Sequence, residues 1–468
     1  MKRILIANRG EIACRIIRAC KALDIATVAV HSEADANALH VQSADAAICI
    51  GPAAPAQSYL KYERILAAAL ESGADGIHPG YGFLSENTDF ARAVETAGLI
   101  WIGPTPQSID EMGDKEKARE VAKVAGVPTL PGSRRFAQGE LDGIEAAAAT
   151  VGYPLLVKAT GGGGGIGMRR VDGPEQLRAC VEATQQLAAK SFSDGTIYLE
   201  RFVPRARHVE IQVFGHGDGT AVHLFERECS IQRRFQKIIE ESPAPGLPAA
   251  LRAQMAEAAS ALAAHQRYRG PGTVEFIVDA QTLEFFFLEM NTRIQVEHPV
   301  TEMVTGWDLV QRQILLAAAG PSLHGFEKIA QKDITFKGAA IECRLYAENP
   351  AKQFFPSPGP LNVFALPAAS QHLRIDTGVR QGDVITPFYD PMIAKMIVWG
   401  LDRTQALAAM KAALAASRIE GVKNNLDFLQ AVIDHPNFAA GHLDTGLVER
   451  ERTALLAATA AIAEAAGE

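Results

Sequence analysis

The first 114 residues alternate short apolar runs with stretches of helical spacing. The apolar run RILIA (3–7) precedes GEIACRIIRACKAL (10–23), where apolar residues recur every three or four positions, and the β-branched run IATVAVHS (25–32) follows. Strands that alternate with helices predict a parallel sheet covered by helices. The turn NRGEIA (8–13) lacks the three glycines of a dinucleotide-binding loop, which argues against a nicotinamide site.

The pattern changes after residue 114. Residues 130–203 combine helical spacing, short strands and a glycine-rich stretch, which predicts a small α+β lid. Farther along, and again after Lys337, runs such as HVEIQVFG and EFFFLEM predict strands. The alanine-rich segment from Thr453 predicts a helix that frays at its end. We therefore expect four regions: 1–114, 115–330 with the lid inside it, 331–450, and a helical tail over 451–468.

Composition limits the class of protein. The chain has 468 residues, 48% of them hydrophobic, with 46 basic against 54 acidic residues and a net charge of −8. This balance is typical of a globular protein and makes binding along a nucleic-acid backbone unfavourable. The six cysteines form no C-x-x-C pair, so we expect neither a zinc site nor a disulfide framework, and we expect a reducing cytoplasmic location. Without a signal peptide or an apolar run of about 20 residues, no membrane insertion is expected.

A run of glycines at 161–165, with a sixth at Gly167, follows an apolar strand that ends near Lys158. Because glycine has no side chain to hold the backbone away, such a run favours close approach of the chain to a ligand. The expected ligand is a phosphate group, which backbone N–H groups can bind. The alternative is a flexible surface linker. The run is not a Walker A loop, because no Lys-Ser or Lys-Thr pair follows it.

The runs VEFIVD (274–279) and EFFFLE (284–289) flank a short turn and predict a β-hairpin. If the hairpin is symmetric about Thr282, Glu275 faces Glu289, and Asn291 lies on the same face two residues farther on. Like charges opposite each other destabilise an antiparallel pair, so the two carboxylates predict a cation between them. Carboxylate and amide oxygens suit Mg²⁺ or Mn²⁺. The alternative is a solvated polar sheet face.

The segment NTRIQVEHP continues from this hairpin. In an extended chain Asn291, Arg293, Gln295 and Glu297 share one face. A small oxyanion substrate requires a guanidinium that binds the anion and a carboxylate that accepts its proton, both close to a metal ligand. This row supplies all three kinds of group. The alternative is the polar side of a half-buried strand.

A third polar group lies upstream, among strand-like residues. Gln232, Arg233, Arg234 and Lys237 concentrate positive charge there. This group predicts either further anion contacts or a solvated basic patch.

Together these motifs closely resemble the biotin carboxylases of the ATP-grasp superfamily. The resemblance covers almost the whole chain and rests on long matches in order: IANRGEIACRI (6–16), HPGYGFLSEN (78–87), MGDK (112–115), KATGGGGG (158–165), HVEIQV (208–213), FLEMNTRIQVEHPVTE (287–302), ECRLYAE (342–348) and YDPMIAK (389–395). It implies an α/β and α+β fold of the biotin carboxylase type. Such a fold has an N-terminal parallel α/β domain, an ATP-grasp region with a mobile lid, and a β-rich C-terminal domain.

The resemblance implies a ligase that carboxylates biotin in two steps. ATP phosphorylates bicarbonate to carboxyphosphate, which breaks down to carbon dioxide and phosphate, and a biotin ureido nitrogen traps the carbon dioxide. ATP, Mg²⁺ (or Mn²⁺) and carrier-bound biotin are therefore the expected ligands. Met410-Lys411 lies in a helical stretch rather than a hairpin, so a separate biotin carboxyl carrier protein and a separate carboxyltransferase subunit are expected partners. Members of this family usually form homodimers.

The resemblance also implies which residues bind the nucleotide. Lys115 and Lys158 would hold phosphates, and the glycine loop would close over them. Glu200 and Val203, on either side of Arg201 and Phe202, would belong to the strand that reads the adenine edge. The residues expected to bind ATP are Lys115, Lys158, Gly163, Gly164, Gly165, Ile166, Gly167, Met168, Glu200, Arg201, Phe202, Val203, His208, Gln232, Phe235, Glu275 and Glu289.

The remaining roles concern bicarbonate, metal and biotin. Glu297 is expected as the general base and Arg344 as the arginine that stabilises the biotin enolate. The expected bicarbonate pocket consists of Lys237, Arg293, Gln295, Val296 and Glu297, the metal ligands are Glu275, Glu289 and Asn291, and the catalytic residues are Glu297, Arg293, Arg344 and Lys237.

Two positions depart from the family pattern. Many members have arginine or lysine where this chain has Ile166, and histidine where it has Phe235. Loss of a cation and of a polar group is expected to weaken ATP binding or alter lid closure, which leaves a nucleotide-binding subunit with little catalysis as an alternative. Another ATP-grasp ligase would share the glycine loop and the metal carboxylates but lack the RIQVE row.

The carboxyl acceptor has two candidate classes. The Gly-Ile-Gly-Met sequence of the loop resembles urea carboxylases, whereas DTGVRQGDVITPFYDPMIAKMIVWG (376–400) resembles acyl-CoA carboxylase α subunits. We expect the first half-reaction of an acetyl-CoA-type carboxylase, with a role in fatty acid biosynthesis. A urea-like or other non-acyl acceptor is the alternative.

Overall fold

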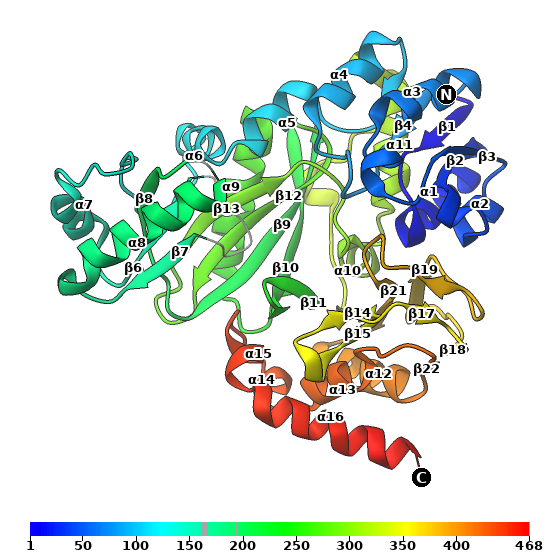
Figure 1. Cartoon of the computed structure of the whole chain (residues 1–468). Coiled ribbons are helices and arrows are strands. Elements are labelled where there is room, and N and C mark those ends of the chain that lie inside the picture. Colours follow the sequence, from blue (N-terminus) through cyan, green and yellow to red (C-terminus); the bar gives the residue numbers. More distant parts are fainter. Residues whose placement is uncertain (161–166, 193, 468) are drawn as a thin grey trace.

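A computed structural model describes residues 1–160, 167–192 and 194–467 of the chain (Figure 1). The N-terminal region forms a parallel sheet with strand order β3-β2-β1-β4-β5. Ile4 and Ile6 of the central strand β1 (Arg3–Ile6) pack with α1 (Gly10–Ala22), and Leu5 packs on the other face with α3 (Tyr62–Glu71). Helices cover both faces, which is why the three buried residues of this strand, Ile4, Leu5 and Ile6, are all apolar.

The other elements of this region confirm the predicted alternation of strands and helices. They are β2 (Ala26–Ser32), α2 (Leu39–Ser43), β3 (Ala46–Gly51), β4 (Gly76–His78), α4 (Thr88–Thr96), β5 (Ile100–Trp101) and α5 (Pro106–Gly113).

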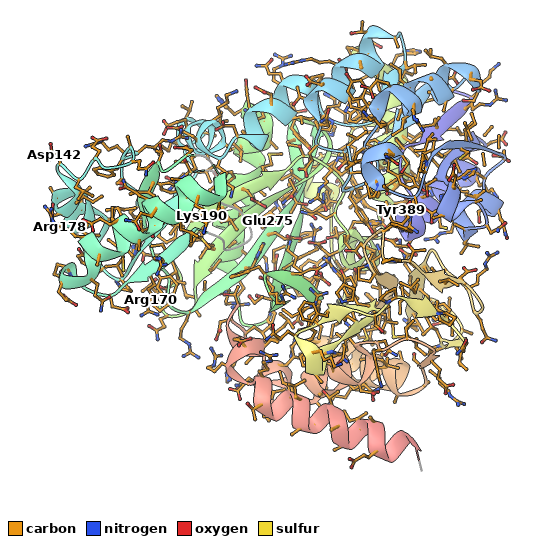
Figure 2. All side chains as sticks on the ribbon, in the orientation of Figure 1. Asp142, Arg170, Arg178, Lys190, Glu275 and Tyr389 are labelled. Atoms are coloured by element: carbon orange, nitrogen blue, oxygen red, sulfur yellow. The ribbon has the colours of Figure 1, made fainter. Side chains whose placement is uncertain are left out.

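The predicted lid is a small antiparallel sheet, β7-β6-β8, with two helices packed on it (Figure 1). Its own core buries Leu155, Val181 and Leu199 completely. Figure 2 shows charged side chains such as Asp142 and Arg178 on its outer surface. Its elements, with the helix that precedes them, are α6 (Lys115–Val124), α7 (Ile144–Val151), β6 (Leu155–Ala159), β7 (Met168–Val171), α8 (Pro174–Phe192) and β8 (Ile197–Arg201).

A large antiparallel sheet, β13-β12-β9-β10-β11-β14-β21-β19, forms the middle of the molecule. Because β11 pairs directly with β14, the sheet continues across the division that we expected near residue 330. The site is therefore built on one continuous hydrogen-bonded framework. Its strands are β9 (Ala206–His216), β10 (Ala221–Arg233), β11 (Gln236–Ser242), β12 (Arg269–Asp279), β13 (Phe285–Asn291), β14 (Ala339–Tyr346), β19 (Leu373–Thr377) and β21 (Met392–Gly400).

Helices and short strands cover this sheet and complete the C-terminal region. Met255 and Leu262 of α9 (Ala249–His265) belong to the same buried core as Val209 and Val213 of β9. The predicted helical tail is α16, whose Leu455 is buried in the C-terminal core. The remaining elements are α10 (His298–Thr305), α11 (Leu309–Ala319), β15 (Glu348–Asn349), β16 (Phe355–Pro356), β17 (Gly359–Pro360), β18 (Val363–Ala365), β20 (Val384–Ile385), α12 (Arg403–Ala415), β22 (Arg418–Glu420), α13 (Leu426–Asp434), α14 (Pro436–Ala439), α15 (Leu447–Arg450) and α16 (Arg452–Gly467). Within the described residues, every helix is too short or too polar to cross a bilayer.

Candidate active site

A cavity of about 850 Å³ is lined by residues of the N-terminal region, the lid and the large sheet. It brings together most of the residues that the sequence singled out, although they come from segments far apart in the chain. The predicted residues that line it are Lys115, Lys158, Met168, His208, Gln232, Phe235, Lys237, Glu275, Glu289, Asn291, Arg293, Gln295, Val296, Glu297 and Arg344.

The hairpin β12–β13 places Glu275 directly opposite Glu289, as predicted. The register shifts by one residue between Glu275 and Phe276, because Phe276 pairs with Phe287 and leaves Leu288 as an extra residue on β13. This bulge turns both Leu288 and Glu289 toward the cavity, which both residues line.

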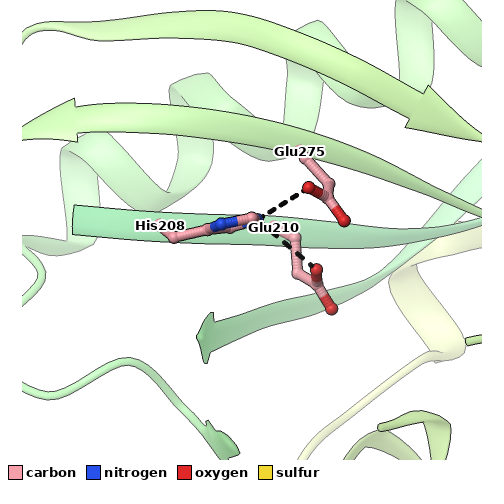
Figure 3. A group of neighbouring side chains, drawn as sticks. All are labelled: His208, Glu210 and Glu275. Carbon is pink, nitrogen blue, oxygen red and sulfur yellow. Dashed lines mark ion pairs between the residues drawn. The ribbon is translucent and has the colours of Figure 1, made fainter. Parts of the chain in front are cut away.

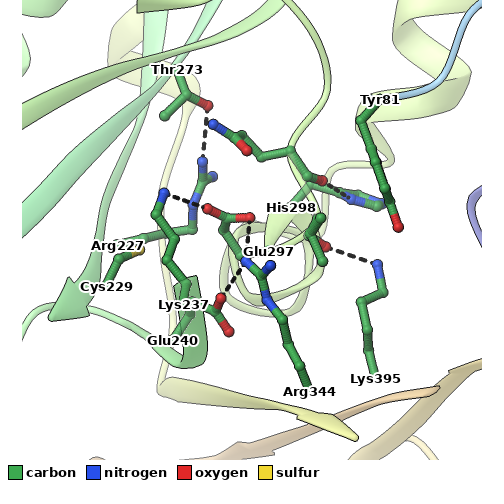
Figure 4. A network of polar contacts seen from close by, with 12 residues as sticks. Tyr81, Arg227, Cys229, Lys237, Glu240, Thr273, Glu297, His298, Arg344 and Lys395 are labelled. Carbon is green, nitrogen blue, oxygen red and sulfur yellow. Dashed lines mark hydrogen bonds and ion pairs between the residues drawn. The ribbon is translucent and has the colours of Figure 1, made fainter. Parts of the chain in front are cut away.

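Lys237 lines the cavity, and Figure 4 shows its side chain beside Glu297. Its Nζ donates hydrogen bonds to Glu210 at 2.6 Å, to Glu275 at 2.9 Å and to Glu297 at 2.8 Å. Burial alone would lower the pKa of this ammonium, but the three carboxylates outweigh it and raise the pKa well above its ordinary value. Lys237 is therefore a permanent positive charge that joins strands β9, β11 and β12 to the turn before α10.

His208, Glu210 and Glu275 form a cluster of potential metal ligands on β9 and β12 (Figure 3). The Nε2 atom of His208 lies 2.8 Å from Glu275 Oε2 and 4.0 Å from Glu210 Oε2. Burial opposes protonation of His208, but the charge of Glu275 raises the pKa of the imidazole. Because the ammonium of Lys237 contacts both carboxylates as well, this cluster is already neutralised by the protein's own cations.

Glu289 lines the cavity and forms no ion pair within the described residues. Burial and the charge of Glu275 raise the pKa of Glu289, so an additional cation beside Glu289 would favour its ionised form. A divalent cation with oxygen ligands fits this arrangement. The amide oxygen of Asn291 accepts a hydrogen bond from Arg293 Nη2 at 2.9 Å, and its Nδ2 donates to Glu275 at 2.8 Å. The second lone pair of that oxygen remains available for a metal ion.

Glu297 is a fully buried carboxylate at the N-cap position of α10. Its Oε1 accepts from Lys237 at 2.8 Å, and its Oε2 accepts from Arg344 Nη2 at 2.9 Å (Figure 4). Burial alone would raise the pKa of Glu297, but Lys237, Arg344 and Arg227 together hold it well below its ordinary value. The carboxylate is therefore ionised and able to accept a proton once its cations turn to another anion.

The row that begins at Asn291 keeps its predicted common face without forming a strand beyond Asn291. Arg293 Nη1 donates to Gln295 Oε1 at 2.9 Å, and Gln295 Nε2 donates to Glu275 at 3.3 Å. Ile294 points into the core of the N-terminal side and is completely buried. Val296 also lines the cavity, because the chain turns there instead of continuing as a strand.

The predicted nucleotide residues of the lid divide into two groups. Lys158 lines the cavity and donates to Glu200 at 2.6 Å, while Arg119 lies 3.1 Å from the other oxygen of Glu200. Glu200 is thus held by two cations instead of lying free. The predicted residues outside the cavity lining are Gly167, Glu200, Arg201, Phe202 and Val203.

Of the two residues that depart from the family pattern, Ile166 and Phe235, the structure describes only Phe235. Ile166, together with Gly163, Gly164 and Gly165, lies outside the described residues. Phe235 is 73% exposed and sits at the tip of the β10–β11 hairpin, where it lines the cavity. Arg234 and Phe235 both have positive φ angles, of 50° and 64°, so this two-residue turn holds non-glycine residues in a left-handed conformation.

Two supporting carboxylates were missed in the sequence. Glu210 follows His208 by two residues in one strand, so the alternation of HVEIQ could have placed it on the same face. Glu86 accepts a hydrogen bond from Arg293 Nε at 2.8 Å, across 207 residues of chain. No local pattern predicts a contact over that separation.

Three family models match the chain in order. The biotin carboxylase N-terminal domain matches residues 1–109, the ATP-binding domain of the carbamoyl-phosphate synthase L chain matches 114–324, and the biotin carboxylase C-terminal domain matches 342–450.

Individual relatives agree with these matches. Biotin carboxylase 1 of Bacillus subtilis (strain 168) is 49% identical over 453 residues, which cover 96% of this chain and 98% of that protein. The mitochondrial methylcrotonoyl-CoA carboxylase subunit alpha of Arabidopsis thaliana is 47% identical over 457 residues, and these cover 98% of this chain but 61% of that protein. The chain therefore spans less than two thirds of this longer relative.

A solved structure shares the fold. It is the biotin carboxylase domain dimer of the Hydrogenobacter thermophilus 2-oxoglutarate carboxylase, in complex with MgADP, ADP and bicarbonate. The TM-score is 0.88 at 42% sequence identity, with 97% of this chain and 98% of that chain covered.

Proposed function

This chain belongs to the biotin carboxylase family, and we propose that it is an ATP-dependent ligase that uses bicarbonate to carboxylate biotin. The observation that carries the proposal is the position of Glu297. It is an ionised, fully buried carboxylate between Lys237 and Arg344, in the same cavity as Glu275 and Glu289.

The contacts of Glu297 suggest how its basicity is controlled. A bicarbonate ion in the cavity competes for Lys237 and Arg293, which are the fixed cations nearest to its proposed pocket. When Lys237 turns toward bicarbonate, it stabilises the anionic form of Glu297 less. The pKa of Glu297 then rises, and Glu297 takes the bicarbonate proton. The substrate therefore activates its own base.

The proposed reaction then follows from this proton transfer. The deprotonated bicarbonate oxygen attacks the γ-phosphorus of ATP, the bond to the bridging oxygen breaks, and ADP leaves with that electron pair. Lys115 and Lys158 bind the phosphates, and Glu275, Glu289 and Asn291 would hold Mg²⁺, whose charge offsets that of the nucleotide. Carboxyphosphate releases carbon dioxide and phosphate. The phosphate takes the ureido proton of biotin, Arg344 stabilises the resulting negative oxygen, and the nitrogen forms its bond to carbon dioxide.

The finer part of the proposal concerns the acceptor and the partners. We propose that the carboxyl group passes to an acyl-CoA of the acetyl-CoA type, through a separate biotin carboxyl carrier protein and a carboxyltransferase, in a cytoplasmic homodimer. The name of the methylcrotonoyl-CoA carboxylase relative supports an acyl-CoA class more broadly than acetyl-CoA. A urea-like acceptor is the competing proposal, and co-purification of the carboxyltransferase followed by assays with each acceptor distinguishes them.

The primary test is ATP cleavage by the purified chain with bicarbonate, in the presence and absence of free biotin. Stimulation by biotin is expected. ATP binding without cleavage would instead indicate a nucleotide-binding subunit. Cleavage that requires an amine or another carboxylate in place of bicarbonate would indicate a different ATP-grasp ligase.

A further inference from the structure

Two buried glutamates lie directly opposite each other behind Arg344. Glu240 on β11 pairs in register with Glu342 on β14, and both side chains are completely buried. No carboxylate oxygen of Glu240 or Glu342 has a hydrogen-bond partner in the described part of the chain, but Glu240 forms an ion pair with Arg344 whereas Glu342 forms none there. Two like charges at such a position repel each other with little solvent screening, so both groups cannot be ionised without a cation between them.

The two cations nearest to this pair, Arg344 and Lys395, form ion pairs and hydrogen bonds with groups other than Glu342. Arg344 contacts the carboxylate of Glu240 and donates to Glu297 Oε2 at 2.9 Å. Lys395, opposite Arg344 on β21, donates to the carbonyl of Val296 at 2.8 Å and lies 3.1 Å from Glu11. Figure 4 shows Arg344 between the carboxylates of Glu240 and Glu297.

The other titratable groups around the pair do not supply a positive charge to Glu342. Glu297, in the turn before α10, is itself an anion. The pKa of His298, the first residue of α10, is held well below its ordinary value by burial, so its imidazole is neutral.

We propose that Glu240 and Glu342 hold one proton between them, carried by Glu342, and that the pair positions Arg344 at the biotin end of the cavity. Glu240 is the anion because its carboxylate contacts Arg344, and Glu342 is neutral because no cation among the described residues contacts it. In agreement, burial raises the pKa of both carboxyl groups, and the charge of Arg344 offsets part of that rise at Glu240. The role of this pair of glutamates in positioning Arg344 for biotin rests on the proposed function.

This arrangement has a consequence during turnover. Arg344 is held by two carboxylates, Glu297 on the cavity side and Glu240 behind it. When Glu297 takes the bicarbonate proton, it loses its charge, and Glu240 remains as the anion that keeps the guanidinium in place. Arg344 is then still oriented when biotin must be deprotonated. Glu240 and Glu342 are thus positioning residues that act through Arg344.

The test compares two isosteric variants. Glu342→Gln replaces a neutral acid with a neutral amide, so kcat/KM for free biotin should stay within about threefold of the wild type. Glu240→Gln removes the anion behind Arg344, so kcat/KM for biotin should fall roughly 10- to 100-fold, with KM for ATP unchanged. Glu240→Asp keeps the charge and should recover part of that loss.

Glu241→Gln is the matched control. Glu241 is the next residue on β11 and is buried too, but it pairs with Arg403 at 2.6 Å and does not line the cavity. This variant should alter stability without changing KM for biotin. An independent readout is the infrared difference spectrum between the wild type and each variant, in which the carbonyl band of one protonated carboxyl group should be lost in Glu342→Gln and retained in Glu241→Gln.

The proposal is overturned if Glu342→Gln loses as much activity as Glu240→Gln, if Glu240→Gln behaves like the control, or if the infrared band persists in Glu342→Gln. A wild-type protein without bicarbonate-dependent ATP cleavage would refute the proposed function instead, and the infrared comparison would still decide where the proton resides. If Glu240→Gln fails to fold, Glu240→Asp and the infrared band carry the test.

Discussion

The Nζ atom of Lys237 lies 2.8 Å from Oε1 of Glu297, and the same ammonium binds Glu210 and Glu275. One lysine therefore compensates three buried carboxylates that come from three separate segments. Because the negative charges outnumber this cation, a change in any member of the group alters the proton affinity of the others.

Replacement of Glu297 by glutamine should separate chemistry from binding. The amide keeps the size of the side chain but cannot accept a proton from bicarbonate, so bicarbonate-dependent ATP cleavage should fall by about 10²- to 10⁴-fold. The affinity for ATP, measured by calorimetry, should change by less than about twofold, because Glu297 contacts the anion pocket rather than the lid. A variant that retains most of its turnover would refute the assignment of the base.

Replacement of Lys237 by methionine should be strongly destabilising. It leaves Glu210, Glu275 and Glu297 buried without their shared cation, which should lower the free energy of unfolding in urea by roughly 3–5 kcal/mol. Lys411→Met is the control, because Lys411 pairs with Asp434 on the surface at 2.5 Å and should matter little. Millimolar Mg²⁺ should restore part of the stability of Lys237→Met only, and equal effects of Mg²⁺ on both variants would contradict this account.

Replacement of Glu289 by glutamine should affect stability and metal use in opposite directions. It removes the repulsion from Glu275, so the free energy of unfolding without metal should rise by about 0.5 kcal/mol. It also removes a metal ligand, so the Mg²⁺ concentration needed for half-maximal ATP binding should increase. Thermal melts and a Mg²⁺ titration of nucleotide binding check both results, and an unchanged Mg²⁺ requirement would exclude Glu289 as a ligand.

Arg119 should contribute to nucleotide affinity through Glu200. Its Nη2 atom lies 3.1 Å from Glu200, whose other oxygen accepts from Lys158 at 2.6 Å. Arg119→Met should loosen this group and raise the Kd for ATP about two- to fivefold, with kcat at saturating ATP nearly unchanged. Arg119→Lys keeps the charge and should lie closer to the wild type. A fall in kcat with unchanged Kd would contradict this role.

Stability should decrease below pH 6.5 because of two buried histidines. Burial lowers the pKa of His40 to about 4 and that of His78 to about 3, from an ordinary value of 6.5. Above pH 6.5 both are neutral whether the chain is folded or unfolded. Below it the unfolded chain binds protons that the folded chain excludes, so the free energy of unfolding falls by up to about 1.4 kcal/mol per pH unit per histidine, until the folded pKa is reached.

His40→Gln tests this pH dependence. The difference in unfolding free energy between pH 7 and pH 5, measured in urea, should be smaller in the variant than in the wild type. Equal differences in the two proteins would show that His40 does not contribute to the acid sensitivity.

Part of the site could be predicted from short-range patterns. The pair Glu275–Glu289 was predicted from hairpin symmetry about Thr282. The pairs nearer the turn, such as Phe276–Phe287, follow a register that would place Leu288 opposite Glu275, and the bulge at Leu288 brings Glu289 there instead. No rule of alternation anticipated that bulge, since it depends on how Phe286 and Phe287 pack against the lid and the large sheet.

The amino-acid sequence by itself determined the parallel N-terminal sheet, the small α+β unit, the hairpin that carries Glu275 and Glu289, and the common face from Asn291 to Glu297, because each depends on periodicity within one segment. Only the tertiary structure decided that Lys237 joins three carboxylates, that Glu86 supports Arg293, and that Glu240 lies behind Arg344. The contacts of Lys237 and Glu240 depend on the order of strands in the large sheet, including the pairing of β11 with β14, whereas the contact of Glu86 joins the loop before α4 to the segment after β13. That order is set by the burial of apolar faces over the whole chain. The charged side chains that meet in the cavity are a consequence of that strand order.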